Sequence, residues 1–351
     1  MYLTLMKGPR STSFLTVDTS GNASFLLGRA ELSNPWVGKG SAKNPLEQVF
    51  DGEVSTYADY DLNERMVSYP DFVSSEFQKW IKKQLVGVHR VGIEDWHLAD
   101  IFRGALLSGG GGPETVGISK KILSMRKSKG ADEIQNLTSA TKMIDYAYKI
   151  AQKNSELGNT ELDVYRKVNF KTFEKYGTFG WIIGDYASGE RSLQVGGWAS
   201  DRKFRKGNTI ILDLQASYNN YWSDLCRTFV IGKKPSGKQE KVAETIVRAL
   251  DRAQDLMKPG TKGKEVYAAV NDEITKAGYP KLIHHAGHSI GLDDQELPWF
   301  IPNSEDEIEE GSVVVVEPGV YTEATGGIRI EDAFVITKKG AERISRYPRD
   351  L

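Results

Sequence analysis

The chain has 351 residues, of which 39% are hydrophobic and 26% are charged, an ordinary globular composition. This length exceeds what one hydrophobic core usually organises, so two domains are expected. Lys and Arg total 46 against 47 Asp and Glu. Because this balance lacks the basic excess typical of proteins that bind nucleic acid or anionic membranes, it favours a small, weakly charged substrate and no nucleic-acid or membrane partner.

The cysteine count and the N-terminal segment bear on the compartment. Cys226 is the only cysteine, which excludes an intrachain disulfide and favours a reducing environment. The opening stretch MYLTLMKGPR lacks the apolar region and cleavage site of a secretory signal. No stretch reaches the ~18 apolar residues that span a bilayer. We therefore expect a cytoplasmic protein.

Residues 1–122 are expected to form a first, α/β domain. Alternation and β-rich composition predict strands at 13–18, 24–28 and 88–93, and helical periodicity predicts helices at 71–85 and 98–107. The glycine-rich tract at 108–113 lacks the preceding buried strand and the lysine of a phosphate-binding loop. We interpret it as a flexible loop.

Residues 123–351 are expected to form a second domain built from two helix pairs, each followed by strands. Helices are predicted at 131–153, 160–176, 236–257 and 261–277, the third capped by Ser236 with Gln239 and the fourth by Thr261. Strands are predicted at 181–184, 209–215, 221–231, 313–317 and 327–337. This order predicts an internal pseudo-repeat, with helix pairs covering one curved antiparallel sheet, although no sequence repeat accompanies it.

Two aspartates are expected to converge on one sheet face. If Asn219–Asn220 is a two-residue hairpin turn, Asp224 lies opposite Gln215 and diagonally beside Asp213. Neighbouring carboxylates repel each other, and a cation between them removes the repulsion. The pair therefore indicates a metal site, whereas either residue alone would more simply be a salt-bridge partner.

Further candidate ligands follow in the last third of the chain. His288 closes a cluster with His284 and His285, and Glu317 ends a run of four valines that is typical of a strand buried on both faces. Glu331 and Arg329 share a strand face by alternation. Four carboxylates and one imidazole suit two Mn, Co, Fe or Zn ions, which could share an activated water for attack on an amide or ester.

The stretches ILDLQASYNNYWSDLCRTF, HHAGHSIGL, VVVVEPGVY and GGIRIEDAFVIT resemble the pita-bread metallopeptidases, which include prolidase, aminopeptidase P and methionine aminopeptidase. The resemblance spans roughly 123–351, and the two-domain layout is similar to that of the creatinase/prolidase branch. It implies an α+β fold in which a creatinase-like α/β domain precedes a pseudo-two-fold, curved antiparallel sheet covered by helix pairs. It also implies a homodimer with two divalent ions per chain, Mn or Co being favoured.

The resemblance implies a role for each candidate residue. Asp213 would bind one ion and His288 the other, while Asp224 and Glu331 would bridge them. Glu317 would be both a ligand and the general acid/base. His284 would line the substrate pocket, and Arg329 would pair with the metal-binding carboxylates.

The sequence departs from this family at four positions. Gln295 stands where a second catalytic histidine is usual, and the segment SLQVGGW lacks an upstream histidine. Gln295 can donate a hydrogen bond but cannot carry a proton. Trp299 takes the place of an arginine suited to a dipeptide carboxylate. Cys226 stands where threonine is common, and we interpret it as a small buried residue, with a redox-sensitive thiol as the alternative.

Three functions remain open from the sequence. The first is hydrolysis of the bond before proline in Xaa-Pro peptides, and the second is hydrolysis or lyase chemistry on a small metabolite. The third is an inactive metal-binding relative, against which the intact Glu317 counts. In a homodimer, His89 or His97 of the partner subunit could replace a missing histidine.

Overall fold

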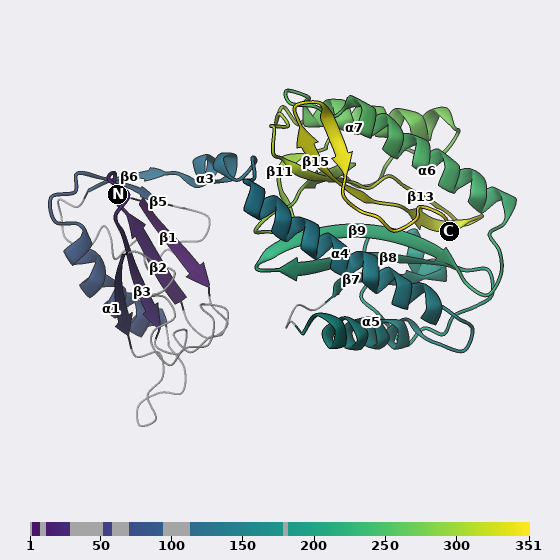
Figure 1. Cartoon of the computed structure of the whole chain (residues 1–351), viewed down its shortest axis with the longest axis horizontal. Coiled ribbons are helices and arrows are strands. Elements are labelled where there is room, and N and C mark those ends of the chain that lie inside the picture. The colour runs from purple at the N-terminus through teal and green to yellow at the C-terminus, as the bar shows by residue number, and fades with distance from the viewer. Residues whose placement is uncertain (1, 8–11, 29–51, 58–69, 94–112, 178–181) are drawn as a thin grey trace. The chain divides into compact units, whose positions relative to one another are not determined.

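The computed structural model describes the chain except residues 1, 8–11, 29–51, 58–69, 94–112 and 178–181 (Figure 1). The chain forms two compact units, residues 1–122 and 123–351, and each is described by itself. Among the described residues, no helix combines the length and the apolarity that a membrane span needs.

The first unit contains a six-stranded mixed sheet with the order β4-β3-β2-β1-β5-β6. Its elements are β1 (Tyr2–Lys7), β2 (Thr12–Val17), β3 (Ala23–Gly28), β4 (Glu53–Tyr57), α1 (Pro70–Gln84), β5 (Arg90–Ile93) and β6 (Glu114–Gly117). The core brings Phe14 of β2 against Phe77 of α1, with ring centroids 4.4 Å apart. The predicted strands and the first predicted helix are confirmed, whereas the predicted helix at 98–107 and most of the glycine-rich tract lie outside the described residues.

Helix pairs build the second unit, which α3 (Ser119–Met125) precedes. The pairs are α4 (Ala131–Asn154) with α5 (Glu161–Tyr176), and α6 (Gly237–Leu256) with α7 (Gly263–Lys276). The predicted capping box of Ser236 with Gln239 is confirmed. The predicted Thr261 cap is wrong: Lys262 is the N-cap residue, and its N–H donates to Glu265. The Thr261 hydroxyl instead donates to the Leu256 carbonyl and closes the preceding loop.

The strands of the second unit pair only in antiparallel fashion, in groups ordered β7-β8-β9, β11-β10-β12-β15-β16 and β13-β14. They are β7 (Ile183–Ser188), β8 (Thr209–Tyr218), β9 (Tyr221–Val230), β10 (Gly287–Ser289), β11 (Glu296–Trp299), β12 (Val313–Val316), β13 (Gly319–Thr322), β14 (Gly326–Arg329), β15 (Asp332–Thr337) and β16 (Gly340–Arg343). Both β14 and β15 contact β9, so the groups adjoin one another.

Each helix pair covers its own part of these strands (Figure 1): α4 packs on β8 and β9, and α6 packs on β13, β14 and β16. The four valines of β12 explain how the two parts join. Val313 and Val315 belong to the core under α4, whereas Val314 and Val316 belong to the core under α6. Alternate side chains of β12 thus pack into two different apolar cores, which confirms that this strand is buried on both faces.

The predicted hairpin register is confirmed. Asn219 and Asn220 have φ values of +50° and +65°, as a two-residue type I′ turn requires. Gln215 therefore pairs with Asp224, and Asp213 pairs with Cys226.

The single strand predicted at 327–337 is wrong, because the chain leaves the ladder at Ile330 and Glu331. The Ile330 N–H donates to the Pro318 carbonyl and the Glu331 N–H donates to the Cys226 carbonyl. These bonds divert the chain from β14, which pairs with β13, to β15, which pairs with β12. The strand predicted at 181–184 extends over Ile183–Ser188.

Candidate metal centre

The five predicted ligands come from separate strands of the second unit. Asp213 lies on β8, Asp224 on β9 and His288 on β10, while Glu317 directly follows β12 and Glu331 lies between β14 and β15. Four of them line a cavity of about 260 Å³, and a donor atom of Glu331 lies within 4.8 Å of those of Asp224 and His288. The structure therefore brings together residues that are more than 100 positions apart in the chain.

Two overlapping sets of donor atoms have metal-binding spacing. One set is Asp224, His288 and Glu331, and the other is His285, His288 and Glu317, with the donor atoms of each set within 4.8 Å of one another. His288 belongs to both, its Nε2 lying 3.9 Å from Asp224 Oδ2 and 3.7 Å from Glu317 Oε1. Asp213 belongs to neither set, and its Oδ2 lies 2.6 Å from Arg329 Nη2.

Buried carboxylate oxygens without a protein partner test whether this cluster fits cations. Asp224 Oδ1 and both Oε atoms of Glu331 make no hydrogen bond, although these residues are only 4% and 1% exposed. Burial, followed by the charge of neighbouring carboxylates, raises the pKa of both groups well above the usual range, and burial raises that of Asp213 to about 6. Such burial is costly unless a cation compensates the charge, so the donor set fits divalent ions.

His288 is prepared as a neutral ligand. Its Nδ1 lies 3.0 Å from the Ser289 carbonyl oxygen, and because a carbonyl only accepts, Nδ1 carries the proton. Nε2 then keeps its lone pair on the side of the carboxylates. Burial also lowers the pKa of His288. A backbone carbonyl that orients an imidazole in this way is a common arrangement behind metal-binding histidines.

Glu317 is surrounded by imidazoles. His285 Nε2 lies 2.7 Å from Glu317 Oε1, and His284 Nδ1 lies 3.8 Å from Oε2. Burial alone would raise the pKa of Glu317, but the His285 hydrogen bond and the imidazole charges bring it to about 2. Burial likewise lowers the pKa of His285, but the bond to Glu317 raises it overall. Glu317 is therefore an ionised carboxylate that accepts a hydrogen bond from His285 Nε2.

Arg329 has the carboxylate partner that was predicted and others that were not. It is 2% exposed, and its guanidinium contacts Asp213, Asp185 Oδ2 at 3.1 Å and the Tyr321 hydroxyl at 2.9 Å. Asp185 lies opposite Asp213 in the β7–β8 pairing. Sequence reasoning missed both residues: Asp185 stands in no quoted motif, Tyr321 closes the stretch VVVVEPGVY without having been given a role, and both reach Arg329 through tertiary contacts.

His284 is among the residues that line the cavity, and protein atoms contact both of its ring nitrogens. Nδ1 donates to the His285 carbonyl at 2.6 Å, and Nε2 lies 2.8 Å from the Tyr321 hydroxyl. Burial lowers the pKa of His284, which favours its neutral form. His284 thus shapes the wall of the cavity and supports Tyr321, whereas the adjacent His285 makes the direct contact with Glu317.

The positions that depart from the family pattern surround the cavity. Gln295 lines it directly before β11, and Val195 and Trp198 line it where a histidine was expected. The Trp299 ring packs on His285 and His288, with centroids 5.6 and 5.7 Å away. Trp299 therefore supports the imidazoles, a role that the sequence did not indicate.

Two other sequence interpretations concern residues away from this lining. Cys226 is wholly buried, its thiol donates to the Arg329 carbonyl at 3.5 Å, and burial raises its pKa. These facts favour a small packing residue over a reactive thiol. The idea that His89 or His97 of the partner subunit completes the site stays a prediction: His97 lies outside the described residues, and His89 is an exposed residue of the first unit.

Known proteins that are similar to this chain identify its family and its fold. Residues 135–338 match the model of metallopeptidase family M24. A Xaa-Pro dipeptidase of Pyrococcus furiosus is 35% identical over 238 residues, which are 67% of this chain and 67% of that protein. The crystal structure of the prolidase from Pyrococcus horikoshii OT3 superposes with a TM-score of 0.83 at 25% identity, covering 100% of this chain and 94% of that one. The His361Ala variant of Escherichia coli aminopeptidase P shares the fold, with a TM-score of 0.78 at 20% identity and coverage of 98% and 90%.

Antiparallel strands flanked by two helix pairs, with carboxylates and imidazoles lining one cavity, define an α+β enzyme of the pita-bread class. The chain belongs to metallopeptidase family M24, and its similarity to prolidases places it in the prolidase-like branch. It is accordingly a metallopeptidase, of a family that uses divalent metal ions.

Proposed function

We propose that the chain is a dinuclear-metal Xaa-Pro peptidase of the prolidase or aminopeptidase P type, which cleaves the peptide bond before proline. One observation carries this proposal. Three buried carboxylate oxygens, one on Asp224 and two on Glu331, have no hydrogen-bond partner in the protein, and they lie close to the His288 imidazole. The similarity to a Xaa-Pro dipeptidase and to prolidases supports the substrate class.

The donor set suggests how the chain would hold two ions, with Mn or Co favoured. Asp213 and Asp224 would serve one ion and His288 with Glu317 the other, while Asp224 and Glu331 would be shared. When bound, the ions supply Lewis-acid polarisation of the scissile carbonyl and a more acidic water. Binding of Asp213 requires its carboxylate to serve both the ion and Arg329, which its two oxygens allow.

Proton transfer in this proposal belongs to Glu317. An ionised carboxylate accepts a proton from the attacking water and returns it to the leaving proline nitrogen, as a general base and then a general acid. His285 holds this carboxylate in place through the 2.7 Å contact. The Gln295 amide can donate a hydrogen bond to the carbonyl oxygen as charge develops there, although it cannot carry a proton.

We further propose that the enzyme is a cytoplasmic homodimer that acts on small peptides and has no nucleic-acid or membrane partner. The near-neutral charge supports the absence of nucleic-acid and membrane partners, and the single buried cysteine supports the cytoplasmic location. The homodimer is proposed from the family resemblance alone.

The lining of the cavity favours a second candidate, hydrolysis or lyase chemistry on a small metabolite. Gln295, Val195 and Trp198 occupy the wall where the family resemblance places histidines, and the last two are 52% and 71% exposed. Such an altered wall would suit a substrate other than a peptide. An inactive metal-binding relative is a weaker candidate, because it would not need Glu317.

Activity assays on the protein reconstituted with metal distinguish these candidate functions. We expect Mn²⁺ or Co²⁺ to support release of proline from Ala-Pro or Met-Pro, and Glu317→Gln to lower kcat by about 100-fold or more. Glu323→Gln, the same change at an exposed residue of the β13–β14 turn, is the matched control and should leave kcat unchanged. About two ions per chain without peptide cleavage would favour the metabolite enzyme, for which a panel of small amides and amidines is the next screen. Failure to bind metal would contradict both enzymes.

A further inference from the structure

The Arg227 side chain is a fully buried cation on β9, three residues beyond Asp224. It forms an ion pair with Asp332, from Nη2 to Oδ1 at 2.7 Å, in which neither side chain has any exposed surface. Burying a guanidinium is costly unless its charge and its five N–H groups are all matched. Arg227 meets this condition.

Every N–H group of Arg227 has an acceptor. Nε donates to the Pro348 carbonyl at 2.7 Å. Nη1 donates to the carbonyls of Cys226 and Glu331, at 2.7 and 2.5 Å. Nη2 donates to Asp332 and, at 2.9 Å, to the Tyr347 carbonyl. One planar group therefore joins three separate segments of backbone.

Two of these segments carry candidate metal ligands. The Cys226 carbonyl accepts from Arg227 and also from the Glu331 N–H, at 3.0 Å. Arg227 thus holds the Glu331 residue by its carbonyl, at the point where the chain leaves the β14 ladder. The Glu331 carboxylate has no protein partner of its own, so its direction depends on how this backbone is held.

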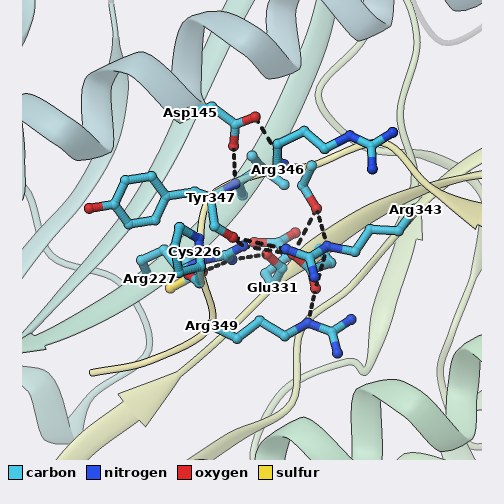
Figure 2. A network of polar contacts seen from close by, with 12 residues as sticks. Asp145, Cys226, Arg227, Glu331, Arg343, Arg346, Tyr347 and Arg349 are labelled. Atoms are coloured by element: carbon cyan, nitrogen blue, oxygen red, sulfur yellow. Dashed lines mark hydrogen bonds and ion pairs between the residues drawn. The ribbon is translucent and has the colours of Figure 1, made fainter.

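The third segment is the C-terminal strap, defined here as residues 345–349, which closes over Arg227. Asp332 accepts from Ser345 Oγ at 2.7 Å and from Arg349 Nε at 2.5 Å. On the other side, Asp145 of α4 accepts the backbone N–H groups of Arg346 and Tyr347, at 2.9 and 3.0 Å (Figure 2). Since the strap is tied to both β15 and α4, it keeps water from the guanidinium.

We propose that Arg227 is a positioning residue of the metal centre, which links the C-terminal strap to the backbone of Glu331 and so keeps the carboxylates of Glu331 and Asp224 at metal-binding spacing. This inference rests on the metal centre of the proposed function. Replacing a residue that orients a metal ligand without itself binding the metal typically lowers metal affinity 10–100-fold.

The test compares Arg227→Lys with Tyr347→Phe in the full chain. A lysine keeps the positive charge but offers at most three N–H groups, so it cannot bind all five acceptors of Arg227. Tyr347→Phe removes only the bond from the Tyr347 hydroxyl to Gln152, and it leaves the Tyr347 carbonyl and every other acceptor of Arg227 in place. Mn²⁺ affinity is measured by titration calorimetry, and near-ultraviolet circular dichroism confirms that each variant is folded.

We expect Arg227→Lys to weaken Mn²⁺ binding about 10–100-fold, and Tyr347→Phe to lower thermal stability with the metal affinity unchanged. If Arg227→Lys folds and binds Mn²⁺ with wild-type affinity, the inference about Arg227 is overturned and the proposed function is not. The same holds if Tyr347→Phe loses as much affinity as Arg227→Lys. A wild-type chain that binds no Mn²⁺ overturns the proposed function as well. If Arg227→Lys does not fold, Asp332→Asn, which keeps the shape of the acceptor, takes its place with the same criteria.

Discussion

The buried ion pair between Lys129 and Glu296 allows a quantitative prediction about stability. The side chains are 2% and 3% exposed, and Nζ lies 3.0 Å from Oε2. Glu296→Leu removes the only ion-pair partner that Lys129 has among the described residues. The ammonium is left with two uncharged acceptors, the Ser289 hydroxyl at 3.0 Å and the Lys127 carbonyl at 3.5 Å. Removing one member of a buried pair typically costs ~3–5 kcal/mol, so we expect the second unit to lose about this much.

Replacing both members should restore most of the stability. In the Lys129→Met, Glu296→Leu double variant no unpaired charge stays buried, and such replacements are often neutral or stabilising. Arg126, the other partner of Glu296, keeps its bond to Asp293 at 2.7 Å. The double variant should therefore be more stable than the Glu296→Leu single variant by about 2–4 kcal/mol.

Native-state hydrogen exchange of the β12 amides is the assay, because β12 pairs with β10 and reports on the second unit alone. Lys127→Met is the matched control. Lys127 is 12% exposed and its partner Asp306, at 3.2 Å, is 34% exposed, so water reaches this pair and its loss should cost no more than ~1 kcal/mol. The reasoning is refuted if Glu296→Leu costs no more than this control, or if the effects of the two single substitutions simply add in the double variant.

Three further predictions concern pH, a glycine and the thiol. Burial raises the pKa of Glu296, but its ion pairs with Lys129 and Arg126 lower it overall from the ordinary value of 4.5. The contribution of ionised Glu296 to the free energy of unfolding is therefore complete above pH 4.5 and is lost as the pH falls through the folded-state pKa. Hydrogen exchange of the β12 amides, followed from about pH 6 to pH 3, should show this loss in wild type and not in Glu296→Gln. Gly184 has φ +124°, and a Cβ there would lie 1.9 Å from the Asp213 carbonyl oxygen. Gly184→Ala should therefore displace Asp213 and weaken Co²⁺ binding, and an unchanged cobalt visible spectrum would contradict this. The Cys226 thiol should react with Ellman's reagent only after unfolding in urea, and rapid labelling of native protein would show that its burial is incomplete.

Features that depend on local chemistry were predictable from the amino-acid sequence. Asn219–Asn220 predicted the hairpin turn, because these residues tolerate positive φ, and the turn set Asp224 opposite Gln215. Four successive valines predicted a strand buried on both sides. The candidate ligands were likewise recognisable by residue type and motif, because donor chemistry is a property of the side chain itself.

Tertiary structure alone decided which side chains meet. Asp185 faces Asp213 only through the β7–β8 register, and Pro348 reaches Arg227 from 121 positions away. Glu331 leaves its ladder because the Cys226 carbonyl, on another strand, accepts its N–H. Periodicity and turn chemistry act over a few residues and are written into the sequence locally. Partners across strands depend on the packing of distant segments, which a local pattern does not encode.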